Sequence, residues 1–116
     1  MKILQDYISK ARKSASQRRL FLAQFIDEFR RLKDLKMLSR PVKKKDRVAL
    51  LFVATAHQLA LDLSLRPPEW LTKCTPLKSP YFVSKIEGLK LLALRDSPYA
   101  FRARNIYVLG NFLSRY

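Results

Sequence analysis

The feature that most constrains this chain is a run of almost uninterrupted apolar residues, which spans residues 48–65 and reads VALLFVATAHQLALDLSL. Its polar members Thr55, Gln58 and Asp62 follow steps of three and four, which predicts one narrow polar stripe on a helix. A helix that is apolar nearly all round has to be covered by other segments. We therefore expect a buried central helix, with Asp46 as its N-cap.

The length of this run approaches that of a membrane-spanning helix. His57, Gln58 and Asp62 would each be costly in lipid, however, and the rest of the chain supplies amphipathic segments that can cover the run. The amino terminus shows no signal-peptide pattern, and the single cysteine, Cys74, cannot form an internal disulfide. We expect a cytoplasmic protein that does not enter a membrane.

The first third of the chain carries a helical pattern. Over residues 3–35 apolar side chains recur in alternating steps of four and three, interrupted by Arg18. This pattern predicts either one basic amphipathic helix of about 30 residues, about 45 Å long, or two helices that meet near residues 14–17. Residues 36–45 lose the period and contain Pro41, which predicts an exposed basic linker.

The carboxy-terminal half predicts shorter elements. Trp70 is expected to fold onto the core as a large anchor. Helical spacing returns over residues 83–95 and stops at Ser97-Pro98, where a further short helix can start. The lone apolar run at residues 106–108 cannot build a sheet by itself, so no strand is expected. The positions expected to face inward in the helix are Val83, Ile86, Leu89, Leu92 and Ala93.

Length and composition agree with one helical domain. The chain has 116 residues, of which 48% are apolar and only two are glycine, so long helices describe it better than disorder does. We expect an all-α fold in which residues 1–116 form a single compact bundle. Residues 1–35 form the basic amino-terminal helix or helix pair, and residues 46–116 form the helical core and tail.

The net charge of +15 is distributed unevenly. Up to Arg47 the chain has 15 basic and 5 acidic residues, whereas the remainder has 9 and 4. Positive charge at this density repels itself, and a polyanion or an acidic protein would relieve that repulsion. The alternative is a solvated basic surface that only maintains solubility.

The residues needed for a reaction centre are scarce. His57 is the only histidine and lies in the most apolar segment, which favours a hydrogen-bonded core histidine over a catalytic base. One cysteine and one histidine cannot form a zinc site, and Gly88 and Gly110 are too isolated for a phosphate-binding loop. We expect no enzyme activity, no metal and no cofactor.

The tail carries the most specific motif of the chain. A Pro-x-Trp turn at residues 68–70 precedes the segment SPYAFRARNIYV at residues 97–108 and the ending Leu-Ser-Arg at residues 113–115. This combination resembles a family of small bacterial helical proteins with a Ser-Pro-x-x-Phe-Arg-x-Arg-Asn-Ile-Phe/Tyr-Val tail. The resemblance implies a helical protein often encoded beside a nucleotidyltransferase-like, AbiEii-type toxin, in the arrangement of a toxin–antitoxin system.

The leading hypothesis that follows is a non-enzymatic, antitoxin-like binding protein that neutralises a nucleotidyltransferase-fold partner. Aromatic side chains would provide buried contact area, and arginines would pair with the metal-binding carboxylates of the partner. The alternative for each residue is a structural role, as a core side chain or a helix cap. The residues expected to contact the partner are Phe101, Arg102, Arg104, Tyr107 and Arg115.

The second hypothesis is nucleic-acid binding through the basic amino-terminal part, alone or together with partner binding. Phe21, Phe25 and Phe29 follow the apolar stripe and are interpreted as core side chains rather than as stacking platforms. The sequence does not distinguish DNA from RNA, and it leaves the oligomeric state open. The cations expected to contact phosphates are Arg12, Lys13, Arg18, Arg19, Lys43, Lys44 and Lys45.

Overall fold

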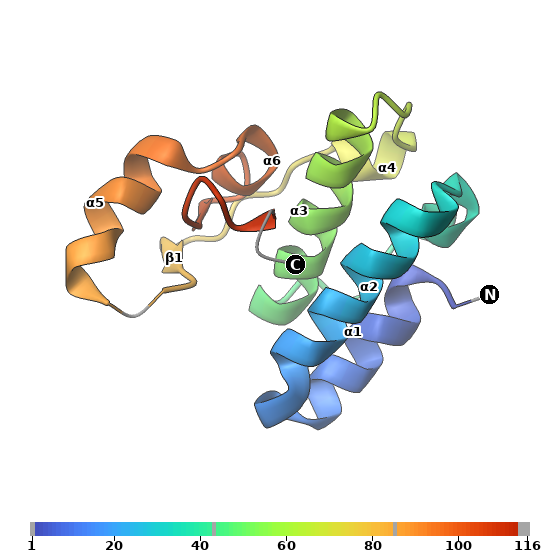
Figure 1. Cartoon of the computed structure of the whole chain (residues 1–116), viewed down its shortest axis with the longest axis horizontal. Coiled ribbons are helices and arrows are strands. Elements are labelled where there is room, and N and C mark those ends of the chain that lie inside the picture. The colour runs from blue at the N-terminus through green and yellow to red at the C-terminus, as the bar shows by residue number, and fades with distance from the viewer. Residues whose placement is uncertain (1, 43, 85, 114–116) are drawn as a thin grey trace.

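The computed structural model describes residues 2–42, 44–84 and 86–113, and it is mostly helical (Figure 1). The order of elements is α1 (Leu4–Lys13), the 3-10 turn η1 (Ala15–Gln17), α2 (Arg18–Leu32), the 3-10 turn η2 (Leu35–Leu38), α3 (Arg47–Asp62), α4 (Glu69–Thr72), β1 (Tyr81–Phe82), α5 (Glu87–Asp96), α6 (Tyr99–Arg102) and β2 (Ile106–Tyr107). The expected all-α class is confirmed in its main content.

Two helices, and not one long helix, form the amino-terminal part. Ser14 is extended, with φ −139° and ψ 95°, so the chain leaves α1 there and turns through η1 into α2. The two helices then lie side by side against α3 (Figure 1). The apolar stripes of both helices thereby face the same core.

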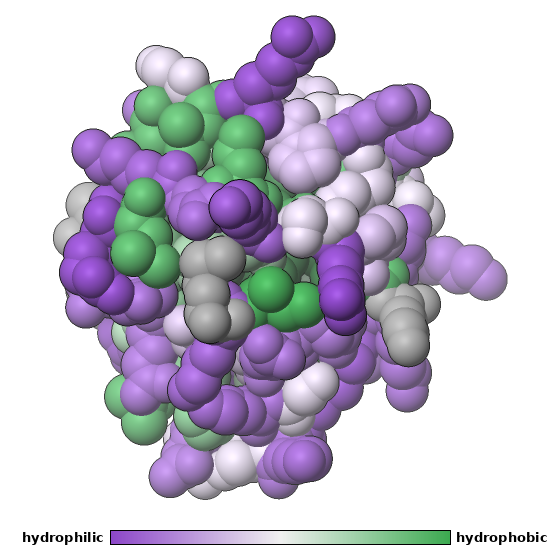
Figure 2. All heavy atoms as spheres, turned by 90° about the vertical axis from the view of Figure 1, so that its right-hand side faces the viewer, coloured by the Kyte–Doolittle hydropathy of each residue, from purple (hydrophilic) through white to green (hydrophobic). Residues whose placement is uncertain are grey.

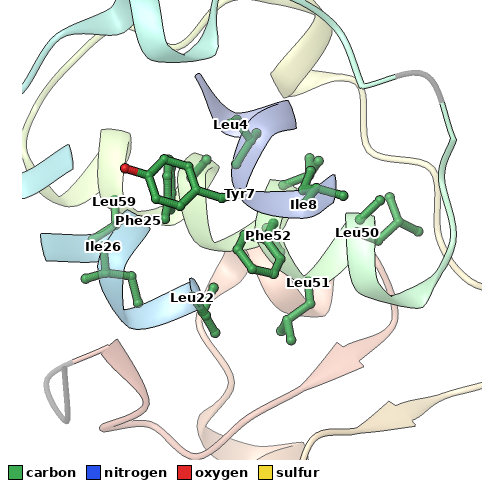
Figure 3. Packing of buried hydrophobic residues seen from close by; sticks show 14 of the residues in the cluster. Leu4, Tyr7, Ile8, Leu22, Phe25, Ile26, Leu50, Leu51, Phe52 and Leu59 are labelled. Atoms are coloured by element: carbon green, nitrogen blue, oxygen red, sulfur yellow. The ribbon is translucent and has the colours of Figure 1, made fainter. Parts of the chain in front are cut away.

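The central helix is buried as the apolar run predicts. Asp46 caps α3 by accepting a hydrogen bond from Ala49 N–H at 2.9 Å. Side chains from α1, α2 and α3 converge around Phe52, and Tyr7 packs edge-on against Phe25 with ring centroids 5.5 Å apart (Figure 3). Thr55 does not lie on an exposed polar stripe as expected. It is buried, and its hydroxyl is satisfied there by donating to Leu51 O within the helix at 2.8 Å.

The connection between α2 and α3 is only partly the exposed linker that the sequence predicts. Met37, Leu38 and Val42 are buried in the core, whereas Lys44 and Lys45 are exposed. Trp70 packs against the same core and donates from its indole Nε1 to Leu38 O at 2.7 Å, so its expected anchoring role is confirmed. The missing periodicity of this segment therefore does not mean that its side chains are solvated.

A short strand pair corrects the expectation that no strand forms. β1 and β2 pair in parallel, with Tyr81 opposite Ile106 and Phe82 opposite Tyr107. The rings of Phe82 and Tyr107 stack with centroids 5.3 Å apart. The pairing was not predictable from periodicity because each strand has two residues.

The helix expected over residues 83–95 is shorter and much less buried than its spacing suggests. α5 begins at Glu87, and Ala93 is its only buried residue. Ile86 and Leu92, both expected to face inward, are exposed. The reason is that α5 lies to one side of the bundle, beyond β1 and α6, where few segments cover it (Figure 1).

Within the described residues, no helix combines the length and the apolar character needed to cross a membrane.

Candidate functional site

Arg104 lies inside the protein, although it was expected to remain available to a partner. Its side chain is only 1% exposed. Nη1 donates to Ala100 O at 2.9 Å and reaches Nδ1 of His57 at 3.1 Å, while Nη2 donates to Leu71 O at 2.6 Å. The prediction of a partner contact at Arg104 is wrong for the folded chain, because its guanidinium is committed to carbonyls of α4 and α6.

This contact fixes the state of His57. A guanidinium can only donate hydrogen bonds, so Nδ1 of His57 has to accept, and the imidazole is neutral with its proton on Nε2. Burial, and to a smaller extent the positive charge of Arg104, together lower the pKa of His57 to about 4. The interpretation of His57 as a hydrogen-bonded core histidine is confirmed.

Most of the tail motif is likewise structural. Phe101 is fully buried and packs edge-on against Phe112, so its expected role as a surface anchor is also wrong. Asn105 adopts a left-handed conformation with φ 61° and donates from Nδ2 to Leu77 O at 3.0 Å. Tyr107 is half-buried against Phe82. The motif therefore describes how the tail folds onto the core.

Two arginines of the expected partner-binding set remain. Arg102 is exposed, and its Nη2 donates to Leu94 O and Arg95 O, which holds the guanidinium at the carboxyl end of α5. Arg115 lies outside the described residues.

More of the exposed large apolar side chains lie on and beside α5 than in the rest of the described chain. Leu91 and Leu94 occupy adjacent turns of one helix face, and Arg95 and Arg102 lie at the carboxyl end of the helix. We call this group the α5 face. Its members and their exposed fractions are Leu91 78%, Ile86 64%, Tyr99 64%, Leu94 44% and Leu92 38%.

The expected phosphate-binding cations come from two segments, which the fold brings together. Arg12 donates to Lys44 O at 2.8 Å and pairs with Asp46 at 3.1 Å, so the carboxyl end of α1 is joined to the linker before α3. Lys13, Lys44 and Lys45 are exposed around this junction. Lys43 lies outside the described residues.

Asp46 is the acidic residue at this junction, and it is already paired. Burial alone would raise the pKa of Asp46, but the hydrogen bonds from Arg12 and Ala49 N–H outweigh burial and lower it. Arg12 is therefore a structural cation, whose positive charge is offset by Asp46. Lys44 also interacts electrostatically with Asp46, although more weakly than Arg12 does.

Arg18 and Arg19 lie nearby, at the start of α2, where they border a pocket of about 370 Å³. Tyr81 also lines this pocket, and the guanidinium of Arg47 lies over its ring, 4.6 Å from the centroid. The carboxyl end of α1 and the amino ends of α2 and α3 thus meet at one side of the molecule (Figure 1). We call this region the basic end; its described cations are Arg12, Lys13, Arg18, Arg19, Lys44, Lys45 and Arg47.

The phenylalanines of α2 are not part of this surface. Phe25 and Phe29 are fully buried, and Phe21 packs against the core, which confirms their interpretation as core side chains. Figure 2 shows a face covered mainly by hydrophilic side chains, with smaller hydrophobic areas between them.

Within residues 2–42, 44–84 and 86–113, no three His, Cys, Asp or Glu side chains gather as a metal site would require. His57 is buried against Arg104, and the Cys74 thiol contacts Thr72 O at 3.7 Å.

Sequence reasoning missed both the α5 face and the pocket. The sequence LKLLALR at residues 89–95 contains four leucines, too many for the single inward stripe assigned to it, and this excess was the available signal for the α5 face. The pocket had no such signal, because its walls come from four separate segments.

Comparisons with models of protein families, with curated proteins and with solved structures find no match to this chain.

The neutral state of His57 generates a prediction for stability. The unfolded chain binds the imidazole proton near pH 6.5 and the folded chain only near pH 4, so acidification favours unfolding. We expect the free energy of unfolding, measured with urea, to fall by about 2 kcal/mol between pH 7.5 and pH 5. In the control variant His57→Gln this loss should disappear. A wild-type stability that stays flat over this range would contradict the assignment.

Proposed function

We propose that this chain is a non-enzymatic, antitoxin-like binding protein that docks a nucleotidyltransferase-fold partner through the α5 face. The observation that carries the proposal is the group of exposed apolar side chains around Leu91. Such groups on otherwise polar surfaces mark sites of protein association. The resemblance of the tail motif to antitoxin-like proteins supplies the partner class.

The contacts that the sequence assigned to Phe101 and Arg104, which are buried, are made by residues of the α5 face in this proposal. Leu91 and Leu94 provide apolar contact area, and the exposed Tyr99 provides a large aromatic contact. Arg102 lies beside them, held by Leu94 O and Arg95 O. Its forked guanidinium suits a carboxylate of the partner, which is the role the sequence assigned to the arginines of the tail.

Charge favours an acidic partner over a second copy of this chain. Each copy carries a net charge of +15, so two copies repel each other as they approach. A partner with an apolar groove bordered by carboxylates meets the leucines and the arginine end of α5 with complementary charge. The acidic metal-binding centre of a nucleotidyltransferase fold has this character.

The test compares two leucine variants by co-expression with the product of the neighbouring gene, which this proposal expects to be a nucleotidyltransferase-fold toxin. Leu91→Asp places a charge at the centre of the α5 face and should weaken the complex at least tenfold, measured as affinity of the purified proteins. It should also restore toxicity of the partner. Leu20→Asp is the matched control, because Leu20 is 51% exposed on α2, and its effect should stay below about twofold.

Two outcomes contradict the proposal. If the neighbouring protein neither co-purifies with the wild-type chain nor loses toxicity in its presence, the antitoxin-like function fails. If both leucine variants weaken the complex equally, the α5 face is not the docking surface.

A second candidate function is nucleic-acid binding by the basic end. The specific observation in its favour is that the Arg12 contacts with Lys44 O and Asp46 join cations that lie more than thirty positions apart in the sequence. Exposed lysines on one side of a protein bind phosphates without base specificity and release counterions. The absence of exposed phenylalanines on α2 favours backbone contact over base stacking.

The triple variant Lys13→Gln, Lys44→Gln, Lys45→Gln tests this candidate. For a duplex probe, the slope of log affinity against log salt should decrease by nearly one for each lost phosphate contact. The matched control Lys33→Gln, Lys36→Gln, Lys78→Gln removes the same charge from exposed positions outside the basic end and should leave the slope nearly unchanged. Equal effects of the two triple variants, or no measurable binding by the wild-type chain, would exclude the basic end.

A further inference from the structure

The pocket at the basic end has no role in either proposed function. Its volume of about 370 Å³ falls within the range of small-molecule sites. It lies between η1 with the start of α2, the second turn of α3, β1 with the segment after it, and the segment after β2. Four separate parts of the chain therefore enclose one concave space.

The inner wall of this pocket is apolar. Leu22 and Leu51 come from the core faces of α2 and α3, and Val108 and Phe112 come from the tail. Val83 and Leu109 are half-buried at the same wall. Such a wall favours a hydrocarbon or aromatic body over a hydrated ion, because apolar burial is the main source of affinity there.

One side of the pocket is positively charged. Arg18 and Arg19 line it, and no acidic side chain is found among its described lining residues. Charge-assisted hydrogen bonds from a guanidinium to an anion are stronger than those between neutral groups, so an anionic group in the pocket would pair favourably with Arg18.

We propose that this pocket binds a small amphipathic carboxylate, with one anionic head and an apolar body. The head lies against Arg18 and pairs with its guanidinium. The body lies along Leu22, Leu51 and Val108. The pocket holds the volume of about a dozen water molecules, so a body on the order of eight to ten carbon atoms fits it.

The test uses octanoate with the full chain, measured by isothermal titration calorimetry below the micellar concentration. Octanoate should bind saturably with one site per chain. Octanol retains the body without the charge, and acetate retains the charge without the body. Both should bind at least tenfold more weakly, because each satisfies only one side of the pocket. Equal binding of octanol, or no saturable octanoate binding, overturns the proposal.

Variants locate the site. Arg18→Gln should weaken octanoate binding about tenfold, whereas Lys73→Gln, which removes one positive charge from an exposed position outside the lining, should change it less than twofold. Ser84→Trp places a large side chain at the half-buried lining position 84 and should abolish binding. Circular dichroism reports whether each variant folds. If only one of the variants at positions 18 and 84 folds, that variant alone tests the location of the site. Octanoate binding unchanged by a folded variant at position 18 or 84 contradicts the proposal.

Discussion

The guanidinium of Arg104 connects the carboxy-terminal segment to the helical core. Removing a charged group from water is costly unless its donors find acceptors, and Arg104 finds them in Leu71 O, Ala100 O and the ring of His57. Burial lowers the pKa of Arg104, but a guanidinium remains protonated in proteins. Burial and, secondarily, the positive charge of Arg104 keep His57 neutral, and the contacts of the guanidinium join α3, α4 and α6 at one point.

Further contacts extend from this point through the tail. Gln58, the neighbour of His57 on α3, accepts from Ala100 N–H at 3.1 Å and thereby positions the start of α6. Leu77 N–H donates to Arg104 O, and Tyr81 N–H donates to Asn105 O, so the segment before β1 lies along the tail. The tail then closes one wall of the pocket and leaves α5 to the side. The pocket and the α5 face therefore both depend on the buried guanidinium of Arg104, which belongs to neither of them.

The sequence predicts those parts of the fold that arise from local patterns. The apolar run gives α3, Asp46 gives its N-cap, and the interruption near Arg18 indicates where α1 and α2 separate. The interior position of Arg104 could not be predicted, because its acceptors at Leu71 and Ala100 come from other segments and an arginine is normally exposed.

In the candidate sites, too, local patterns were predictable from the sequence and contacts between distant segments were not. The cations of the basic end were identifiable from composition, while the Arg12 contact that joins them required the fold. Phe101 looked like an exposed anchor in a compact motif, but its spacing equally fits a core position, and the structure buries it. Ile86 and Leu92 were counted toward an inward stripe but are exposed, because spacing alone does not tell which face of a helix finds a covering segment.

Hydrogen exchange of the variant Arg104→Met tests the central role of this side chain most directly, because methionine keeps an apolar stem and removes the donors. If Arg104 connects the tail to the core, the amides of Leu77, Tyr81 and Val83, which bond to residues 104–107, should exchange much faster. The amides of α1 and α2 should keep their protection. Unchanged exchange at these three positions, or an equal increase in α1 and α2, would contradict the account.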